Sequence, residues 1–134
     1  MESDNKLAEN KELNKKILVV DDDRFISRLL TQTFEFEGFS VSSANNGKDA
    51  IKQAETFLPD LIILDVMMPE MDGWDVCKEL KSRPDTSSIP IIMLTAKSQG
   101  KDFEKGKSLG VAHYVAKPFN YAELLEKVKG IVNK

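Results

Sequence analysis

Carboxylate, hydroxyl and ammonium side chains each follow a short apolar segment of the sequence. They belong to Asp21, Asp22, Asp65, Thr95 and Lys117. Three clustered carboxylates repel one another unless a cation or protons join them. Hard oxygen ligands without sulfur or imidazole favour Mg²⁺, with Mn²⁺ as a further candidate. An ammonium and a hydroxyl opposite such a metal suit a phosphoryl group, and an Asp carboxylate can be the nucleophile that forms an aspartyl phosphate.

The stretch around Asp65 is the most informative part of the chain. Residues 61–64 form a wholly apolar run, which is typical of a strand buried on both faces. Pro69, Asp72 and Gly73 then indicate a loop. Ligands of an open parallel sheet bind beyond the carboxyl ends of its strands, so a stiff strand would hold the Asp65 carboxylate at a binding edge. Considered alone, Asp65 could equally open a turn.

Five apolar segments alternate with five helical patterns along the chain. The expected strands cover residues 17–20, 39–44, 61–64, 90–94 and 113–116. Helical periodicity runs from residue 24 to Gly38, from the turn at 45–47 to Pro59, after Gly73, over residues 98–109, and after Asn120. This alternation predicts right-handed crossovers and a doubly wound α/β fold, in which helices cover both faces of a five-stranded parallel sheet.

Particular helices carry further local signals. In the first helix, apolar residues recur with helical spacing at Phe25, Ile26, Leu29, Leu30 and Phe34. A capping box is expected at the last helix, formed by Asn120 and Glu123. Trp74 and the methionines that follow Asp65 are interpreted as packing residues.

Length and composition restrict the class of protein. The chain has 134 residues, with 41% hydrophobic residues, 31% charged residues and a net charge of −3. This balance is typical of a single globular domain and does not indicate a nucleic-acid or membrane surface. Residues 1–15 are interpreted as a flexible polar leader without the apolar core of a signal peptide, so a cytoplasmic location is expected. The single cysteine, Cys77, and single histidine, His113, exclude an internal disulfide and a histidine-rich metal site.

Four short motifs stand in order along the chain: VDDD at 20–23, DVMMPEMDG at 65–73, LTA at 94–96 and YVAKPF at 114–119. Together they resemble the receiver domain of bacterial two-component response regulators, similar to the chemotaxis response regulator. The resemblance covers residues 16–134 and implies a flavodoxin-like sheet of order 2-1-3-4-5. It also implies Mg²⁺-dependent phosphoryl transfer from a histidine kinase phosphohistidine, in a phosphoacceptor domain that is not itself an enzyme.

The resemblance implies a role for each motif residue. Asp65 would be the phosphoacceptor. The implied metal ligands are Asp21, which acts mainly through metal-bound water, Asp22, Asp65 and the backbone carbonyl of Met67. The implied phosphoryl contacts are Thr95, the Ala96 backbone and Lys117.

The resemblance further implies a conformational switch and a gate. Tyr114 would turn inward as Thr95 moves, and the face around these residues and the last two helices would then bind partners. The Lys117–Pro118 peptide bond would be cis. The side chains of Met67 and Lys97 would flank the approach of the water that removes the phosphoryl group.

The expected partners are a sensor histidine kinase or phosphotransfer protein and a downstream protein target. A phosphorylation-dependent dimer is a further expectation, whereas direct contact with nucleic acid or membrane is not expected. A phosphohydrolase of haloacid dehalogenase type is an alternative, since Asp21 and Asp23 fit its first motif, but it would need an acidic pair after Lys117 and would leave Asp65 without a role. The second alternative is a receiver-like interaction scaffold that is not phosphorylated.

Overall fold

The fold of the computed structural model is described for residues 15–96 and 108–133. Five parallel strands form one sheet in the order β2-β1-β3-β4-β5. The strands are β1 (Lys16–Val20), β2 (Ser40–Ala44), β3 (Leu61–Asp65), β4 (Ile91–Ala96) and β5 (His113–Lys117). The helices described are α2 (Arg24–Phe36), α3 (Gly47–Phe57), α4 (Gly73–Lys81) and α6 (Tyr121–Val132). The doubly wound parallel sheet and its predicted strand order are therefore confirmed.

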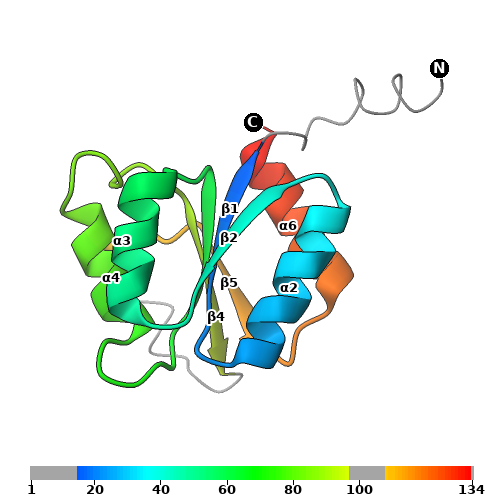
Figure 1. Ribbon diagram of the computed structural model, residues 1–134, viewed down its shortest axis with the longest axis horizontal. Helices are drawn as coiled ribbons and strands as arrows, with labels where there is room; N and C mark the ends of the chain where they lie inside the picture. The colour runs from blue at the N-terminus through cyan, green and yellow to red at the C-terminus, as the bar shows by residue number, and fades with distance from the viewer. Residues whose placement is uncertain (1–14, 97–107, 134) are drawn as a thin grey trace.

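Of the helices described, α3 and α4 cover one face of the sheet, and α2 and α6 cover the other (Figure 1). Successive strand residues point to opposite faces, so a strand covered on both sides is apolar throughout. In β1, Leu18 belongs to the core beneath α3 and α4, whereas Ile17 belongs to the core beneath α2 and α6. The same alternation holds in β3 for Ile62 and Leu61.

The strand register brings the functional side chains to one edge of the sheet. Val20 of β1 pairs with Leu64 of β3, so each strand leads to an aspartate at the next position. Asp65 pairs with Leu94 of β4, and Ala96 of β4 pairs with Lys117 of β5. The carboxyl ends of β1, β3, β4 and β5 thus lie side by side, as the sequence predicts.

Side-chain caps fix where all four described helices begin. At α3 the Asn46 side chain accepts a hydrogen bond from the Asp49 N–H at 2.8 Å. Asp23 caps α2 by accepting hydrogen bonds from the backbone of Phe25 and Ile26. Asp72 and Asp75 form a reciprocal capping box at α4. Of the capping box predicted at α6, the structure shows the bond from the Glu123 N–H to Asn120 Oδ1, at 3.3 Å.

Several boundaries and exposures differ from the sequence expectations. Strand β4 begins at Ile91 and not at residue 90 as predicted, and it ends on Thr95 and Ala96. The carbonyl of Lys15, the last residue of the predicted leader, accepts a hydrogen bond from the Ser40 N–H at 2.9 Å. Phe25 is an exposed residue of α2 and does not join the core with Leu30. The helix predicted over residues 98–109 lies outside the described residues except for its last two positions.

Among the described residues, no helix combines the length and apolar character that crossing a membrane requires.

Candidate functional site

Three carboxylates meet at the carboxyl edge of the sheet. Asp21 follows β1 directly, and Asp65 is the last residue of β3; both are buried. Asp22 is exposed beside them. One carboxylate oxygen from each of the three lies within 4.8 Å of the others. The structure therefore brings together the three acidic residues that the sequence analysis selected.

The backbone of Asp21 is held by the neighbouring edge strand. Its N–H donates to the carbonyl of Ala44 at 3.2 Å, and its carbonyl accepts a hydrogen bond from the Asn45 side-chain amide at 2.9 Å. The Asp21 carboxylate also accepts from the backbone N–H of Asp23 at 3.0 Å. The sequence analysis interpreted Asn45 only as part of a turn, because no local pattern indicates a partner 24 residues away.

Lys117, the last residue of β5, forms ion pairs with both buried carboxylates. Its Nζ lies 3.2 Å from Asp21 Oδ2 and 3.2 Å from Asp65 Oδ1. The Lys117–Pro118 peptide bond that follows is cis, the geometry that the resemblance implies. The ammonium compensates part of the negative charge at this edge, as an opposite charge close to buried carboxylates must.

The pKa of Asp65 is raised from 3.8 to about 6. Burial is the main cause and repulsion from Asp21 the second, while Lys117 and the Met67 N–H, 3.3 Å from Asp65 Oδ1, oppose the rise. The pKa of Lys117 is also raised: its burial disfavours the charge, but the attraction of Asp21 and Asp65 outweighs that effect. The site thus holds more negative charge than one ammonium neutralises.

Thr95 and Ala96 of β4 lie next to the acceptor strand. Thr95 is buried and comes one position after the β4 residue that pairs with Asp65. Tyr114 of β5 is partly buried and packs on the core beneath α3 and α4. Of the two residues of the expected switch, Thr95 therefore lies near the carboxyl end of β4, and Tyr114 lies on the neighbouring strand β5. Lys97, a residue of the expected gate, lies outside the described residues.

Met67 differs from the interpretation as a packing residue. Its side chain is 65% exposed, while the next residue, Met68, is buried. The loop turns the Met67 backbone toward the Asp65 carboxylate, which leaves its side chain at the surface. Met67 is therefore a residue of the site rim and does not belong to the core.

Gly73 is a structural residue of the site that the sequence analysis interpreted only as part of a loop. A Cβ atom at this position would lie 2.4 Å from the carbonyl oxygen of Asp65 and 2.9 Å from the Cα of Val66. The Gly73 N–H donates to the Val66 carbonyl at 2.9 Å. Only glycine allows α4 to begin so close to the acceptor strand.

The donor set fits a hard divalent cation. It consists of three carboxylates, and hard oxygen ligands of this kind are those that Mg²⁺ or Mn²⁺ prefers. The repulsion between Asp21 and Asp65 that raises the pKa of Asp65 would be relieved by such a cation. The residues present are therefore compatible with the predicted metal.

Comparisons with known proteins identify the family of the chain. Residues 17–129 match the response regulator receiver domain family. The chain is 47% identical over 122 residues to the alkaline phosphatase synthesis transcriptional regulatory protein PhoP of Bacillus subtilis, covering 91% of this chain and 50% of that protein. It is 40% identical over 119 residues to the phosphate regulon transcriptional regulatory protein PhoB of Rhizobium meliloti, covering 89% of this chain and 52% of that protein. The chain spans about half the length of these curated relatives.

Solved structures show the same fold. A putative response regulator from Chloroflexus aurantiacus matches with a TM-score of 0.84 at 36% identity, covering 90% of this chain and 99% of that one. The chemotaxis protein CheY4 of Vibrio cholerae matches with a TM-score of 0.83 at 31% identity, covering 88% of this chain and 98% of that one. The fold and site define a doubly wound α/β domain with an acidic cluster at the carboxyl edge of its sheet. The chain belongs to the receiver domain family of response regulators, which act in two-component signalling. The phosphohydrolase and scaffold alternatives are not favoured.

Proposed function

We propose that Asp65 accepts a phosphoryl group from a phosphohistidine of a sensor kinase or phosphotransfer protein. The observation that carries this proposal is the placement of its buried carboxylate, 3.2 Å from Lys117 Nζ and within 4.8 Å of two further carboxylates. A nucleophile needs a fixed position, and the end of a central strand supplies it. The ammonium of Lys117 and the carboxylates of Asp21 and Asp22 both lie close to the Asp65 carboxylate.

The transfer uses the atoms of this site as follows. A carboxylate oxygen of Asp65 forms a bond to phosphorus while the bond between phosphorus and the donor imidazole nitrogen breaks. The imidazole keeps that electron pair and takes a proton from solvent. Lys117 neutralises one phosphoryl oxygen, and the Thr95 hydroxyl and the Ala96 backbone N–H donate to others.

The side chains of Asp21, Asp22 and Asp65 and the Met67 carbonyl would hold Mg²⁺. When bound, the cation supplies positive charge that offsets the charge of the phosphoryl oxygens. The protein residues keep the acceptor in place: Asn45 and Ala44 fix the backbone of Asp21. The burial of Asp65 limits the access of water.

Intact mass after treatment with a small acyl phosphate tests the proposal. With Mg²⁺ present, the wild type should gain one base-labile phosphoryl group, and Asp65→Asn should gain none. Asp23→Asn is the matched control, because Asn preserves the α2 cap that Asp23 provides. Labelling of Asp65→Asn at the rate of the wild type would show that another residue is the acceptor.

A mostly apolar groove beside the acceptor edge is the surface we propose for the phosphohistidine donor. It has a volume of about 460 Å³ and is lined by Ile26, Leu29, Lys117, Pro118, Phe119 and Tyr121. Its position beside Lys117 connects an apolar contact surface directly to the reacting centre. Apolar side chains of a donor helix would bury the exposed part of Leu29.

Comparing two phosphoryl donors tests this surface. Leu29→Gln should slow transfer from a phosphorylated histidine protein about tenfold, as loss of an apolar anchor does. The same variant should accept the phosphoryl group from the small acyl phosphate at the rate of the wild type, because the reacting centre is intact. Equal transfer from the protein donor by both proteins would place the donor elsewhere.

The remaining functional assignments follow from the same proposal. A domain that only receives and releases its own phosphoryl group has no turnover on a separate substrate, so phosphomonoester hydrolysis should be absent. We infer a cytoplasmic domain whose kinase and target are proteins, and whose phosphorylated form changes the face that contains Thr95 and Tyr114. The phosphorylation-dependent dimer and the flexible leader over residues 1–15 remain predictions.

A further inference from the structure

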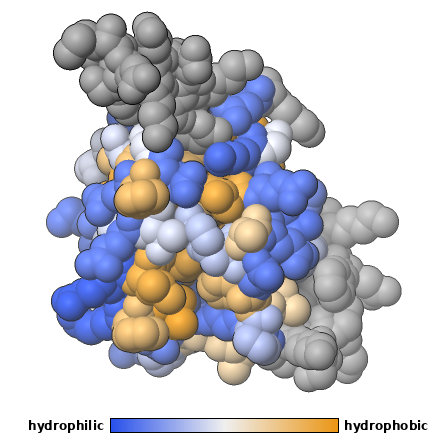
Figure 2. Space-filling model, turned by 90° about the vertical axis from the view of Figure 1, so that its right-hand side faces the viewer, coloured by the Kyte–Doolittle hydropathy of each residue, from blue (hydrophilic) through white to orange (hydrophobic). Residues whose placement is uncertain are grey.

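Helix α2 carries a second apolar face that points away from the core. Leu30 and Phe34 are buried against the sheet, whereas Phe25 is 74%, Leu29 49% and Phe36 89% exposed. Figure 2 shows apolar surface on the side of the molecule that α2 and α6 form, with polar residues around it. Among the described residues, these three account for most of the large apolar side chains that are exposed.

The three residues lie on one line along the helix. The intervals from Phe25 to Leu29, to the exposed Gln32 and to Phe36 are four, three and four residues. This spacing is that of the contact positions of a coiled-coil helix, a seam narrower than the face that packs on a sheet. The seam extends about 16 Å along the axis, at about 1.5 Å per residue. An apolar seam of this shape fits another helix.

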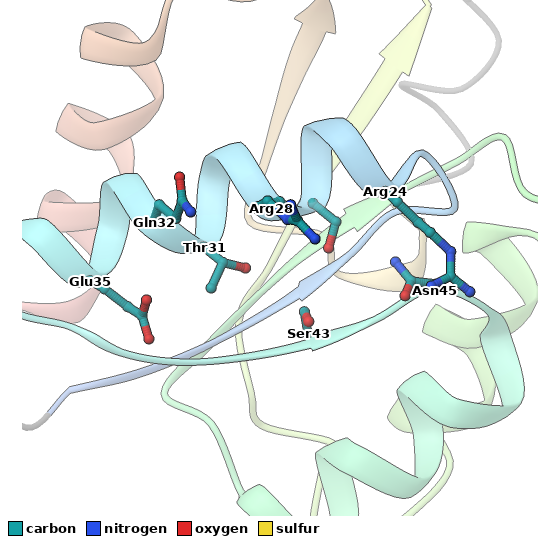
Figure 3. A pocket seen from close by; sticks show the side chains of 8 residues that line it. Arg24, Arg28, Thr31, Gln32, Glu35, Ser43 and Asn45 are labelled. Atoms are coloured by element: carbon teal, nitrogen blue, oxygen red, sulfur yellow. The ribbon is translucent and has the colours of Figure 1, made fainter.

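Charge is divided between the two halves of the same helix. Arg24 and Arg28 belong to its first half, whereas Glu35 lies in its last turn and Glu37 follows the helix as its C-cap residue. Arg28 and Glu35 are seven residues apart and therefore flank the seam on the same side. Figure 3 shows both side chains projecting from α2 along the shallow groove that faces Ser43 and Asn45 of the sheet edge.

This division of charge favours a second copy of α2 in antiparallel orientation as the helix that packs on the seam. An antiparallel second copy of α2 would place Arg28 beside the partner's Glu35, and two-fold symmetry would form that pair twice. The same register would set Phe25 against the partner's Phe36 and Leu29 against the partner's Gln32. A parallel arrangement would instead place Arg28 opposite the partner's Thr33, without an opposite charge. We propose that the protein associates with itself through antiparallel α2 helices. Because Leu29 also lines the groove proposed for the phosphohistidine donor, self-association and donor binding exclude each other.

The interface is small, which determines the concentration at which it forms. Stable interfaces bury about 1,200–2,000 Å² in total, and a single short helix pair lies below this range. We therefore expect a weak, reversible dimer in the unphosphorylated protein, with a Kd on the order of 100 µM. Because α2 lies on the outer face of the fold, the two sheets would lie on opposite sides of the helix pair (Figure 1).

Sedimentation velocity of the full chain, from about 10 µM to about 1 mM, tests the proposal. Phe36→Gln should remove self-association, since it deletes an end contact of the seam. The Phe36→Gln substitution should leave phosphotransfer unchanged, because Phe36 lies at the end of α2 that is remote from the acceptor edge. Leu58→Gln is the matched control: Leu58 is also an exposed apolar residue, but it lies outside α2, and its variant should associate as the wild type does.

Charge reversal tests the orientation of the helices. Arg28→Glu and Glu35→Arg should each weaken the dimer about tenfold, because two attractive pairs become repulsive. The double reversal should restore the affinity of the wild type. An equimolar mixture of the two single variants should form a heterodimer more tightly than either forms a homodimer. A protein that stays monomeric at the highest concentration, or a double reversal that does not restore association, would overturn the proposal.

Discussion

The indole ring of Trp74 lies 6.3 Å from the ring of Tyr114, centroid to centroid, at an interplanar angle of 47°. Trp74 is the second residue of α4 and is buried, so its surroundings depend on both the acceptor loop and β5. The residue that precedes it, Gly73, donates a hydrogen bond to the carbonyl of Val66, next to Asp65. The single tryptophan therefore connects the proposed acceptor with the proposed switch.

This contact predicts a fluorescence signal for phosphorylation. Beryllofluoride added with Mg²⁺ should change Trp74 emission beyond the change with Mg²⁺ alone, because movement of Tyr114 alters the packing of the indole. Asp65→Asn should remove the additional change, and Tyr114→Leu should reduce it while leaving the response to Mg²⁺. An additional change of full size in Asp65→Asn would show that Trp74 does not report on this site.

The raised pKa of Asp65 predicts how stability depends on pH in the absence of metal. The pKa is about 6 in the folded protein and 3.8 in the unfolded reference, so between these values the folded state binds more protons. The free energy of unfolding should therefore fall as pH rises from about 4 to about 6, and should then level off. The full effect is on the order of 3 kcal/mol, at about 1.4 kcal/mol per pKa unit.

Urea unfolding in EDTA measures this effect. Asp65→Asn should be more stable than the wild type at pH 7.5, by about 1–3 kcal/mol, and the difference should narrow at pH 4.5. Mg²⁺ should stabilise the wild type through binding to the folded state, and should stabilise Asp65→Asn less. A wild type whose stability is unchanged between pH 4.5 and 7.5 would contradict the assigned cause.

The strand ends of the site could be predicted because each depends on local sequence. Residues 61–64 are apolar without interruption, so the strand and the aspartate at its end follow from the pattern alone. The end of β4 on Thr95 and Ala96 follows from the same kind of pattern, because the apolar run over residues 91–94 leads directly into these two residues.

The outward face of α2 and the hydrogen bond of Asn45 could not be predicted from local sequence. Phe25 and Phe34 both fit a helical period, and hydrophobicity alone does not indicate which of them faces the sheet. Asn45 contacts Asp21 because β2 lies beside β1, a neighbour relation set by the folded sheet. Both features depend on how the elements pack, which is information that periodicity lacks.

The close contact at Gly73 predicts a large effect of a single methyl group. In Gly73→Ala the new Cβ would meet backbone atoms of Asp65 and Val66, which cannot rotate away, so α4 or the end of β3 must shift. We expect the free energy of unfolding to fall by about 2–3 kcal/mol, within the range of overpacking. Phosphorylation by the acyl phosphate should slow as well, because the acceptor would be displaced.

Gly130→Ala is the matched control for that variant. Gly130 is an exposed residue of α6, and a Cβ atom added there would meet no other atom within 4 Å. Alanine there should raise the free energy of unfolding by about 0.5–1 kcal/mol through helix propensity, without an effect on phosphorylation. Equal destabilisation by both substitutions in urea unfolding would show that the contact at Gly73 is not the cause.

The exposed side chain of Met67 predicts a long-lived phosphoryl group. It is 65% exposed at the rim of the site, two residues after Asp65, and its apolar thioether cannot orient a water molecule by strong hydrogen bonds. Met67→Asn supplies an amide that can, so loss of the phosphoryl group should accelerate about tenfold, a modest part of what a full general base contributes. Decay of the labelled protein, followed by intact mass after removal of the phosphoryl donor, measures this rate.

Lys97 provides a second, independent test of the same gate. It follows Thr95 by two positions, and its charged ammonium can donate hydrogen bonds but cannot accept a proton from water. Lys97→Glu should therefore also accelerate decay, because a carboxylate can accept that proton. The Met67→Asn, Lys97→Glu double variant should lose its label faster than either single variant. A double variant that decays at the rate of the wild type would show that neither side chain controls the approach of water to the Asp65 phosphoryl group.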